Sequence, residues 1–313
     1  MDKQLLKEVI DCLPKGRTKF FYFKDRYAAM LLADFVGNGM SVGQVKQSAF
    51  AGLLQRPAVK QLVANSGNGV LTAEMLRGVW EFPQPFLLTL AGWGGKDRSW
   101  YQVSRPGYNL VLQMNFTASH DREYDKLTSD ELLFGSFSHP VMQKGQRPLF
   151  RNTVAWSRID LDFATGEALI EEVQSDWMRY VLSDVKWAKA QLKKCGQNQG
   201  ALCKTCYRTK IVKYFDNAVA PYVSLWQEAM LSAAIEFIRN ELGIKVIYYH
   251  SFETGRQVKK ISWRQPPRSV YTDLPRKFCF QQTGEAPEFL VADKAFRKQY
   301  RKLKNPQWFR LAA

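Results

Sequence analysis

The sequence predicts a mixed α/β (α+β) fold, with a mostly antiparallel sheet preceded by a helical N-terminal region. Three observations support this prediction. Helical spacing of apolar residues dominates the first hundred residues, and the period changes to two from Tyr108. A strand, a long helix and a second strand then follow one another between residues 168 and 250. The 313 residues, 46% of them hydrophobic, can bury one large core or two ordinary ones.

The formal charge of +16 at pH 7 is the strongest global feature. Excess Lys and Arg are attracted to phosphate backbones, so we expect a nucleic acid, DNA or RNA, as partner. The longest apolar runs are too short to span a bilayer, and the first residues lack the apolar core of a signal peptide. We therefore expect a soluble, cytoplasmic protein that does not bind membranes.

Residues 1–97 are predicted to form the mainly helical N-terminal region. The apolar segment 25–36 has helical spacing and is closed by Gly37. Ser41 and Gln44 have the spacing of a capping box, which predicts that another helix begins there. A strand-like run at residues 20–23 and an apolar run at 86–90 interrupt this pattern.

Residues 98–290 are expected to form the main domain. Alternating apolar residues from 108 to 116 give the clearest strand. The turn Ala164-Thr165-Gly166-Glu167 separates two further strands, residues 154–163 and 168–177, and predicts an antiparallel hairpin.

The second half of that domain begins with a basic, helix-rich insertion at residues 178–221. A long apolar helix is predicted to start at Ser224, with Gln227 at the capping-box position, and to end at Gly243. It leads to a strand at 244–250, which we expect to be parallel to strand 168–177. A short helix and a final strand from Phe278 complete the domain.

The strand 168–177, ALIEEVQSDW, carries the strongest signal of a functional site. On a strand, Glu172, Gln174 and Asp176 share one face. Burying three such groups is costly unless they have partners or a ligand. The alternative is an edge strand with a solvated face. Candidate substrate-binding residues at and around this strand are Gln174, Ser175, Trp177, Arg105 and His250.

The two residues of that set outside the strand rest on separate observations. Arg105 belongs to the turn Ser-Arg-Pro-Gly, which suits an anion; an ordinary strand-entry turn is the alternative. His120, His139 and His250 are too scattered to define a metal site, and each is expected to be structural. His250, at the end of a predicted strand, is the best functional candidate of the three.

The order of elements over about residues 108–285 resembles that of GNAT-type acyltransferases. It comprises a strand meander, a long helix, a strand, a short helix with Tyr271 and an FCF strand. The resemblance implies acetyl-CoA as donor, Glu172 or Glu171 as base, and Tyr271 as the acid that protonates the leaving thiolate. Asp176 is a further catalytic candidate. The family's pyrophosphate loop is absent from the start of the long helix, so another donor, or none, remains an alternative.

A second, local likeness involves EEVQSDW itself, from Glu171 to Trp177. Together with Trp226 and the Tyr-x-x-Leu-Pro segment at residues 271–275, it resembles a domain of the large polyvalent proteins of phages and other mobile elements. This resemblance implies a mobile-element setting and names no reaction.

Cys195, Cys203 and Cys206 have C-x7-C-x2-C spacing inside the basic insertion. Three thiolates, closed by His250 or Cys279, match the ligand preferences of zinc. The alternative is reduced thiols without a metal.

The segment 291–313 is predicted to be a basic tail that contains aromatic residues. Cations interleaved with aromatic rings suit phosphate contact with base stacking. The alternative is a solvated helix whose aromatic side chains dock on the main domain. The candidate nucleic-acid-binding residues are Lys294, Arg297, Lys298, Arg301, Lys302 and Lys304.

These observations favour a group-transfer enzyme, acyltransferase-like, that acts on or near nucleic acid in a phage or mobile-element setting. A non-catalytic nucleic-acid-binding accessory protein is the main alternative. An ADP-ribosyl transferase with Glu172 or Glu171 as its acid is the third.

Overall fold

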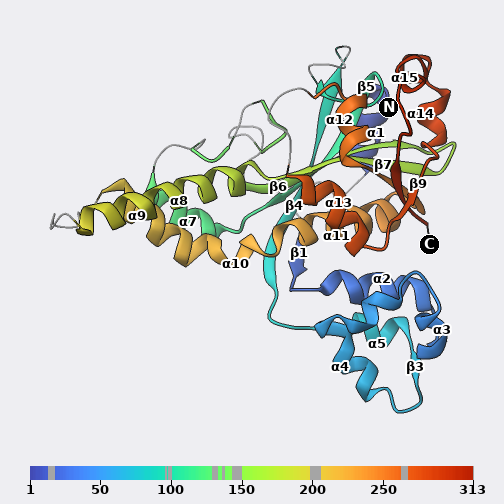
Figure 1. Ribbon diagram of the computed structural model, residues 1–313, viewed down its shortest axis with the longest axis horizontal. Coiled ribbons are helices and arrows are strands. Elements are labelled where there is room, and N and C mark those ends of the chain that lie inside the picture. The colour runs from blue at the N-terminus through green and yellow to red at the C-terminus, as the bar shows by residue number, and fades with distance from the viewer. Residues whose placement is uncertain are drawn as a thin grey trace.

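The computed structural model describes residues 1–12, 18–95, 97, 101–128, 133–135, 138–142, 150–197, 206–261 and 267–312, with the backbone alone for residues 195–197. A sheet of eight strands forms its centre (Figure 1), and every neighbouring pair except β7 and β8 is antiparallel. The mixed, mostly antiparallel sheet predicted from the sequence is thereby confirmed. In spatial order the strands are β1 (Thr18–Tyr22), β4 (Gln84–Gly95), β5 (Gly107–Asn115), β6 (Thr153–Asp162), β7 (Glu167–Gln174), β8 (Val246–His250), β10 (Trp308–Leu311) and β9 (Gln281–Thr283).

The centre of the sheet follows the prediction closely. β6 and β7 form the expected hairpin, and Gly166 in its turn has φ of 66°, which glycine adopts without a steric penalty. β8 runs parallel to β7, with residues 167–170 opposite 246–249. A β-bulge interrupts β7: Ile170 lies opposite Ile159, whereas Arg158 faces Glu172, so Glu171 is the extra residue.

The end of β7 differs from the prediction. The strand stops at Gln174, and helix α8 (Asp176–Gln197) begins directly after Ser175. The hydroxyl of Ser175 accepts a hydrogen bond from the backbone N–H of Met178 over 3.0 Å, as an N-cap side chain does. Asp176 and Trp177 are therefore helical, and of the three residues expected on one strand face only Glu172 and Gln174 are on the strand.

One face of the sheet is covered by α11 (Trp226–Glu236), which continues through the π-helical turn Phe237–Glu241. Small and apolar side chains such as Ala229, Met230 and Ala233 form a single core with Ile170 and Val173 of β7. Its N-cap is Leu225, one residue after the predicted Ser224, and Leu225 makes no side-chain cap bond. Its end agrees with the prediction.

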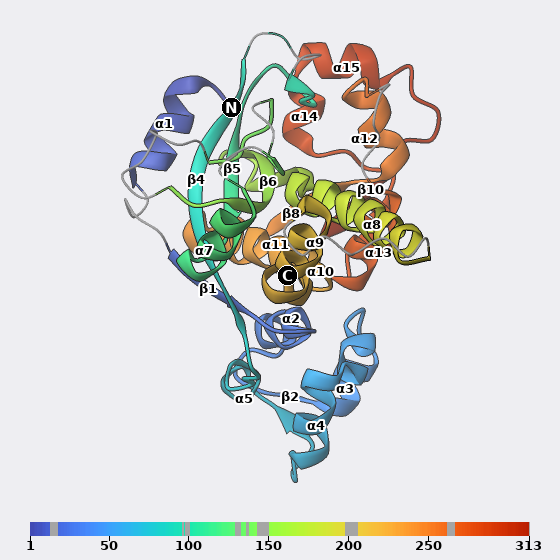
Figure 2. The ribbon, with the colours of Figure 1, turned by 90° about the vertical axis from the view of Figure 1, so that its left-hand side faces the viewer.

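The N-terminal region is divided between two places. Helix α1 (Lys3–Cys12) packs on β4 and β5, while β1 and β4 themselves join the main sheet. The remaining elements form a helical lobe at one end of the molecule (Figures 1 and 2). The capping box of Ser41 and Gln44 is confirmed there. The lobe consists of α2 (Arg26–Val36), β2 (Met40–Ser41), α3 (Val42–Lys46), the 3-10 helix η1 (Ala51–Gln55), α4 (Pro57–Asn65), β3 (Val70–Leu71) and α5 (Ala73–Arg77).

A helical arm built around α8 projects to one side of the sheet, at the left of Figure 1. Trp177 anchors its base: the side chain is buried, donates to the Tyr214 hydroxyl over 3.0 Å and packs against Phe116 and Tyr124. The other members of the arm are α7 (Ala118–Leu127), α9 (Tyr207–Tyr214), the π-helix η2 (Phe215–Val219) and α10 (Ala220–Val223).

The C-terminal part completes the other end of the sheet with α12 (Phe252–Val258), α13 (Arg268–Lys277), α14 (Glu288–Ala292) and α15 (Lys294–Tyr300). No strand starts at Phe278; β9 begins at Gln281, and the last strand is β10. The segment 291–313 is not a free tail, because β10 lies between β8 and β9 and pairs with both. Among the helices described, none has the length and apolar character needed to cross a membrane.

Candidate functional site

The two faces of the central strands differ in character. Val173 and Ile170 belong to the apolar core beneath α11. On the other face, Arg158 lies opposite Glu172, and Trp156 lies opposite Gln174. These residues are buried or nearly so. A polar sheet face of this kind requires partners for every charged group, and the partners form two adjoining clusters.

The first, here named the buried charge cluster, consists of Arg158, Glu171, Glu172, His250 and Lys259. The Arg158 guanidinium forms an ion pair with Glu172, and Lys259 Nζ lies 4.0 Å from the same carboxylate oxygen. Burial by itself raises the pKa of Glu172, but the two cations outweigh it, and the net pKa is lowered. Glu172 is therefore ionised and already neutralised by its neighbours.

Glu171, the bulge residue, is held in a different way. Its carboxylate accepts hydrogen bonds from the Ser104 N–H over 2.9 Å and the Ser104 hydroxyl over 2.8 Å, and lies 3.0 Å from His250 Nε2. Against the effect of burial, the bond to His250 and the nearby cations lower the pKa of Glu171 to about 2. Burial outweighs the carboxylate at His250 itself and lowers the pKa of that imidazole, so the ring is neutral.

Ser104, His250 and Glu171 do not form a nucleophile–base–acid relay. In such a relay the two imidazole nitrogens serve different partners. Here the Ser104 hydroxyl lies 2.9 Å from Nε2, the same nitrogen that contacts Glu171, while Nδ1 has no partner among the described residues. All three side chains are fully buried. The cluster shapes the sheet face, and base catalysis by Glu171 or Glu172 stays a prediction.

Tyr271 lies in the first turn of α13, the helix in which it was expected. Its hydroxyl is buried and has no hydrogen-bond partner among the described residues. Burial, followed by the negative charge of Glu172, raises its pKa well above the ordinary value. The residue lines a pocket of about 370 Å³ together with Arg268, Arg276 and Lys304. Lys259 Nζ lies 5.8 Å from the centre of the same ring, so Tyr271 adjoins both the pocket and the charge cluster.

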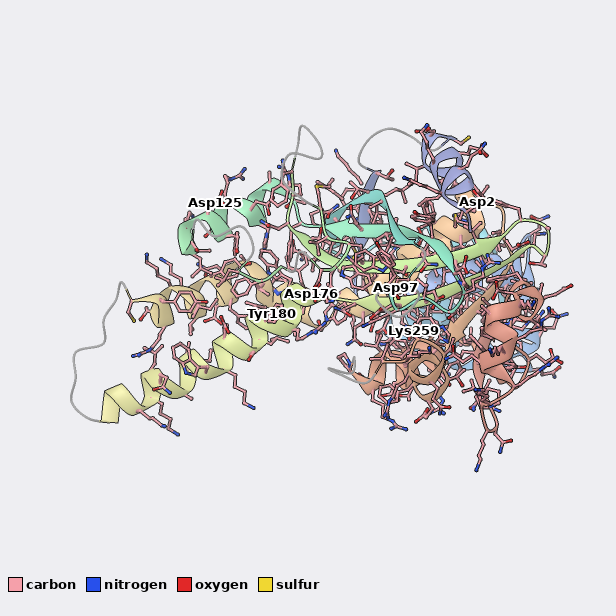
Figure 3. All side chains as sticks on the ribbon, turned by 90° about the horizontal axis from the view of Figure 1, so that it is seen from above. Asp2, Asp97, Asp125, Asp176, Tyr180 and Lys259 are labelled. Carbon is pink, nitrogen blue, oxygen red and sulfur yellow. The ribbon has the colours of Figure 1, made fainter. Side chains whose placement is uncertain are left out.

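The second cluster lies where β7 passes into α8, at Asp176 (Figure 3). His139 Nδ1 is 2.8 Å from both carboxylate oxygens of Asp176, and Gln174 donates to Oδ1 over 2.8 Å. Trp156 and Arg179 also contact this carboxylate. The Asp176 side chain is 1% exposed, whereas His139 is 29% exposed. This His139–Asp176 dyad thus joins a buried acid to an imidazole that reaches the surface.

The ionisation of Asp176 fixes the tautomer of His139. Burial raises the pKa of Asp176, but the hydrogen bond and charge of His139, with Gln174 and Arg179, outweigh it and lower the pKa. An ionised carboxylate only accepts hydrogen bonds, so the hydrogen between the two groups is on Nδ1. In the neutral ring Nε2 then carries the lone pair, and none of the described residues bonds to it. That is the arrangement of an oriented general base.

The structure brings together only part of the predicted site. Gln174 contacts Asp176, and Glu171 contacts His250. Lys259 lies close to both Glu172 and Tyr271. Trp177 is a core residue, and Ser175 caps a helix. Arg105 is no open anion site, because it forms an ion pair with Asp160 at 2.7 Å and stacks on Phe289. Sequence reasoning missed His139, which the chain brings to Asp176 from 37 residues away.

The predicted zinc site falls largely outside the described residues. Nothing is described for Cys203 or for the side chain of Cys195. Cys206 is half-buried at the start of α9, with its sulfur 3.5 Å from the Thr209 hydroxyl. Within the described part of the chain, no three His, Cys, Asp or Glu residues are grouped to hold a metal ion. Zinc binding stays a prediction.

The six predicted nucleic-acid-binding cations are all exposed, five of them on or just beyond α15 and Lys304 in the loop before β10. Three of their aromatic neighbours, Phe296 of α15 and Trp308 and Phe309 of β10, are buried and not available for stacking on bases. Tyr300 is half-buried and stacks on Phe296. Aromatic side chains docked on the main domain are the alternative considered for this segment.

Comparison with known proteins does not assign this chain to a family. No protein-family model, no curated protein and no solved structure matches the chain.

Proposed function

We propose that this chain is a group-transfer enzyme of the acyltransferase type, with His139, oriented by Asp176, as its proton-transfer group. The observation that carries the proposal is the His139–Asp176 dyad: a buried, ionised carboxylate 2.8 Å from Nδ1 of a partly exposed imidazole. Among the described titratable groups of this sheet face, His139 combines contact with solvent and a carboxylate that orients it.

The dyad suits the proton transfers of an acyl transfer. An acceptor N–H or O–H would lose its proton to His139 Nε2 as its lone pair forms a bond to the acyl carbon of the donor. The bond between that carbon and the leaving group then breaks, and the leaving group keeps the electron pair and takes up a proton. The positive imidazolium is stabilised by Asp176 throughout. Proton transfer of this kind contributes about 10²–10⁴-fold to rate.

Tyr271 and the resemblance in element order support the acyl-transfer version of the proposal. The Tyr271 hydroxyl keeps its proton at neutral pH, as a general acid must, and burial raises its pKa further above the ordinary value. Acetyl-CoA is the donor that the resemblance implies. The setting we propose is a phage or mobile element, and the cytoplasm of its host.

The test is release of free CoA thiol from acetyl-CoA, with the full-length protein and a panel of acceptors: single-stranded DNA and RNA, a polyamine and a lysine peptide. We expect one acceptor to support turnover, and His139→Asn and Asp176→Asn to lower it at least about 100-fold. Their melting midpoints show whether each variant folds. Turnover that survives in a folded His139→Asn protein contradicts the assignment. Absence of thiol release with every acceptor contradicts acyl transfer, and consumption of NAD in a parallel assay supports the ADP-ribosyl transferase instead.

A non-catalytic nucleic-acid-binding protein is the second candidate, and the exposed cations of the C-terminal segment favour it. Their test is substitution, since deletion of residues 291–313 also removes β10. Replacing Arg297, Lys298 and Arg301 by Gln leaves the buried Phe296 in place. The slope of binding affinity against salt should become shallower if these residues contact phosphates. An unchanged slope removes this role.

A further inference from the structure

Three cations form a straight row on α8. Arg179, Lys186 and Lys193 repeat every seven residues, which is close to two helical turns, so each is rotated only about 20° from the last. The row lies on the solvent side of the arm: Lys186 and Lys193 are exposed and Arg179 is half-exposed. We name these residues the α8 row. It is about 21 Å long at the usual helical rise.

Two large apolar side chains of α8 close to the row are exposed. Trp187, next to Lys186, is 48% exposed and Leu182 is 40% exposed. The Arg208 guanidinium lies 5.5 Å from the centre of the Trp187 ring. The Trp187 ring is therefore held at the surface beside a cation. Aromatic rings beside a line of cations suit stacked bases and their phosphates.

The charge of α8, α9 and η2 is predominantly positive, whereas α7 carries three acids against two cations. Residues 176–219 contain nine Lys and Arg against three Asp, a net charge of +6. One of those acids, Asp176, is buried in the dyad, and Asp184 is engaged by the Tyr207 hydroxyl over 2.9 Å. The exposed side of α8 therefore presents almost only positive charge, which is complementary to a phosphate backbone.

The α8 row also starts at the dyad. Arg179, its first member, donates to Asp176 Oδ1 over 3.2 Å, and one turn of helix separates the two residues. Figure 3 shows Asp176 at the end of α8 nearest the sheet, with Tyr180 one turn further along. A strand bound along the row would pass directly to His139.

We propose that the α8 row and Trp187 bind single-stranded nucleic acid and lead it to the His139–Asp176 dyad. The delivery of the strand to His139 rests on the proposed function, whereas the binding of the strand to the α8 row is independent of that function. A single strand fits better than a duplex because its bases are free to stack on the exposed rings.

The test is fluorescence anisotropy of a labelled 12-nucleotide dT strand, and of its RNA counterpart, titrated with the full-length protein between 50 and 300 mM salt. Lys186→Gln with Lys193→Gln should flatten the slope of log affinity against log salt by about 1.4, since each single-strand phosphate contact contributes about 0.7. Trp187→Ala should weaken binding about 5-fold or more at every salt concentration.

The matched control is Lys46→Gln with Lys60→Gln, which removes the same charge from exposed positions of α3 and α4 in the helical lobe. If the slope of log affinity against log salt flattens equally in this control, net charge alone attracts the strand, and the proposal is overturned. The proposal would also be overturned if a 12-base-pair duplex bound more tightly than the single strand and Trp187→Ala left the affinity for the duplex unchanged. His139→Asn should bind normally; if it binds normally and also keeps thiol release, the enzyme assignment fails while the α8 row stands.

Discussion

Lys259, the C-cap residue of α12, donates its Nζ to the main-chain carbonyl of Glu171 over 2.7 Å. The bulge in β7 is what leaves this carbonyl for a side chain. The same ammonium lies 4.0 Å from Glu172. One buried lysine therefore serves both the bulged backbone and the adjacent carboxylate.

Lys259→Met should lower the free energy of unfolding by about 3 kcal/mol, because it leaves a buried carbonyl without a donor and removes one of two cations beside Glu172. Urea unfolding followed by circular dichroism measures this loss. Lys260→Met, at the exposed neighbour, should change stability by less than about 0.5 kcal/mol. Equal losses of unfolding free energy at the two positions would show that the buried ammonium of Lys259 does not stabilise the fold.

Gly255→Ala tests how closely α12 packs on His250. An added Cβ would lie 3.0 Å from the His250 Cβ and 3.1 Å from its Cγ, closer than ordinary contacts. We expect a loss of about 1–3 kcal/mol in unfolding free energy. Gly52→Ala in η1 is the control, since no atom lies within 4 Å of its added Cβ, and it should be neutral or slightly stabilising. A harmless Gly255→Ala would mean that α12 can move away from the strand.

Tyr271→Phe should leave the unfolding free energy unchanged or raise it, since the hydroxyl removed is buried without a partner among the described residues. Tyr249→Phe is the paired control: its hydroxyl donates to the Val270 carbonyl over 3.0 Å, and its loss should cost about 1 kcal/mol. Thermal melting compares the two. If Tyr271→Phe keeps stability but loses thiol release, the hydroxyl acts in the reaction; a large fall in its melting midpoint would place it in the structure instead.

Stability should fall as pH drops from about 6.5 toward 5. Burial lowers the pKa of His250 in the folded protein, so the unfolded chain takes up its proton first, and stability rises with pH across this window. The groups that face His250 are Ser104, Glu171 and Lys259, with Arg158 beyond. Glu171, whose pKa is lowered to about 2, loses its own contribution only at more acidic pH.

His250→Gln isolates that proton. We compare how steeply the free energy of unfolding rises with pH between pH 5 and 6.5 in the two proteins. The slope of the variant should be shallower than that of the unchanged protein by up to about 1.4 kcal/mol per pH unit. Urea titrations at four pH values give both slopes. Equal slopes for the two proteins would mean that His250 keeps its proton in the folded protein over this pH range.

Features encoded in adjacent residues were predictable from the sequence. The Ser41–Gln44 capping box and the β6–β7 hairpin depend on residues a few positions apart, and both are confirmed. The start of α8 also had a local signal, a serine followed by an acid in the first helical turn, which the strand-like alternation of the preceding residues obscured. The bulge at Glu171 has no such signal, because it depends on the register of the neighbouring strand.

Long-range features were not predictable in the same way. The dyad joins His139 and Asp176 across 37 residues, and no residue near His139 marks its partner. The polar pattern of EEVQSDW did identify the correct strand. It did not show that Glu171 and Glu172 would be paired with Arg158, His250 and Lys259, since each of these partners comes from another element or strand.

The place of β10 in the sheet determines the order in which the sheet can be assembled. β10 provides the only partner recorded for β9 among the described strands, and it covers the edge of β8. During synthesis, β8 ends at His250 and therefore emerges about sixty residues before β10 begins at Trp308, and β7 emerges earlier still. Until then the β8 edge has unpaired N–H and C=O groups, and β9 has no ladder to join. This half of the molecule therefore closes last, and a nascent chain that stalls before residue 308 exposes a strand edge prone to intermolecular pairing.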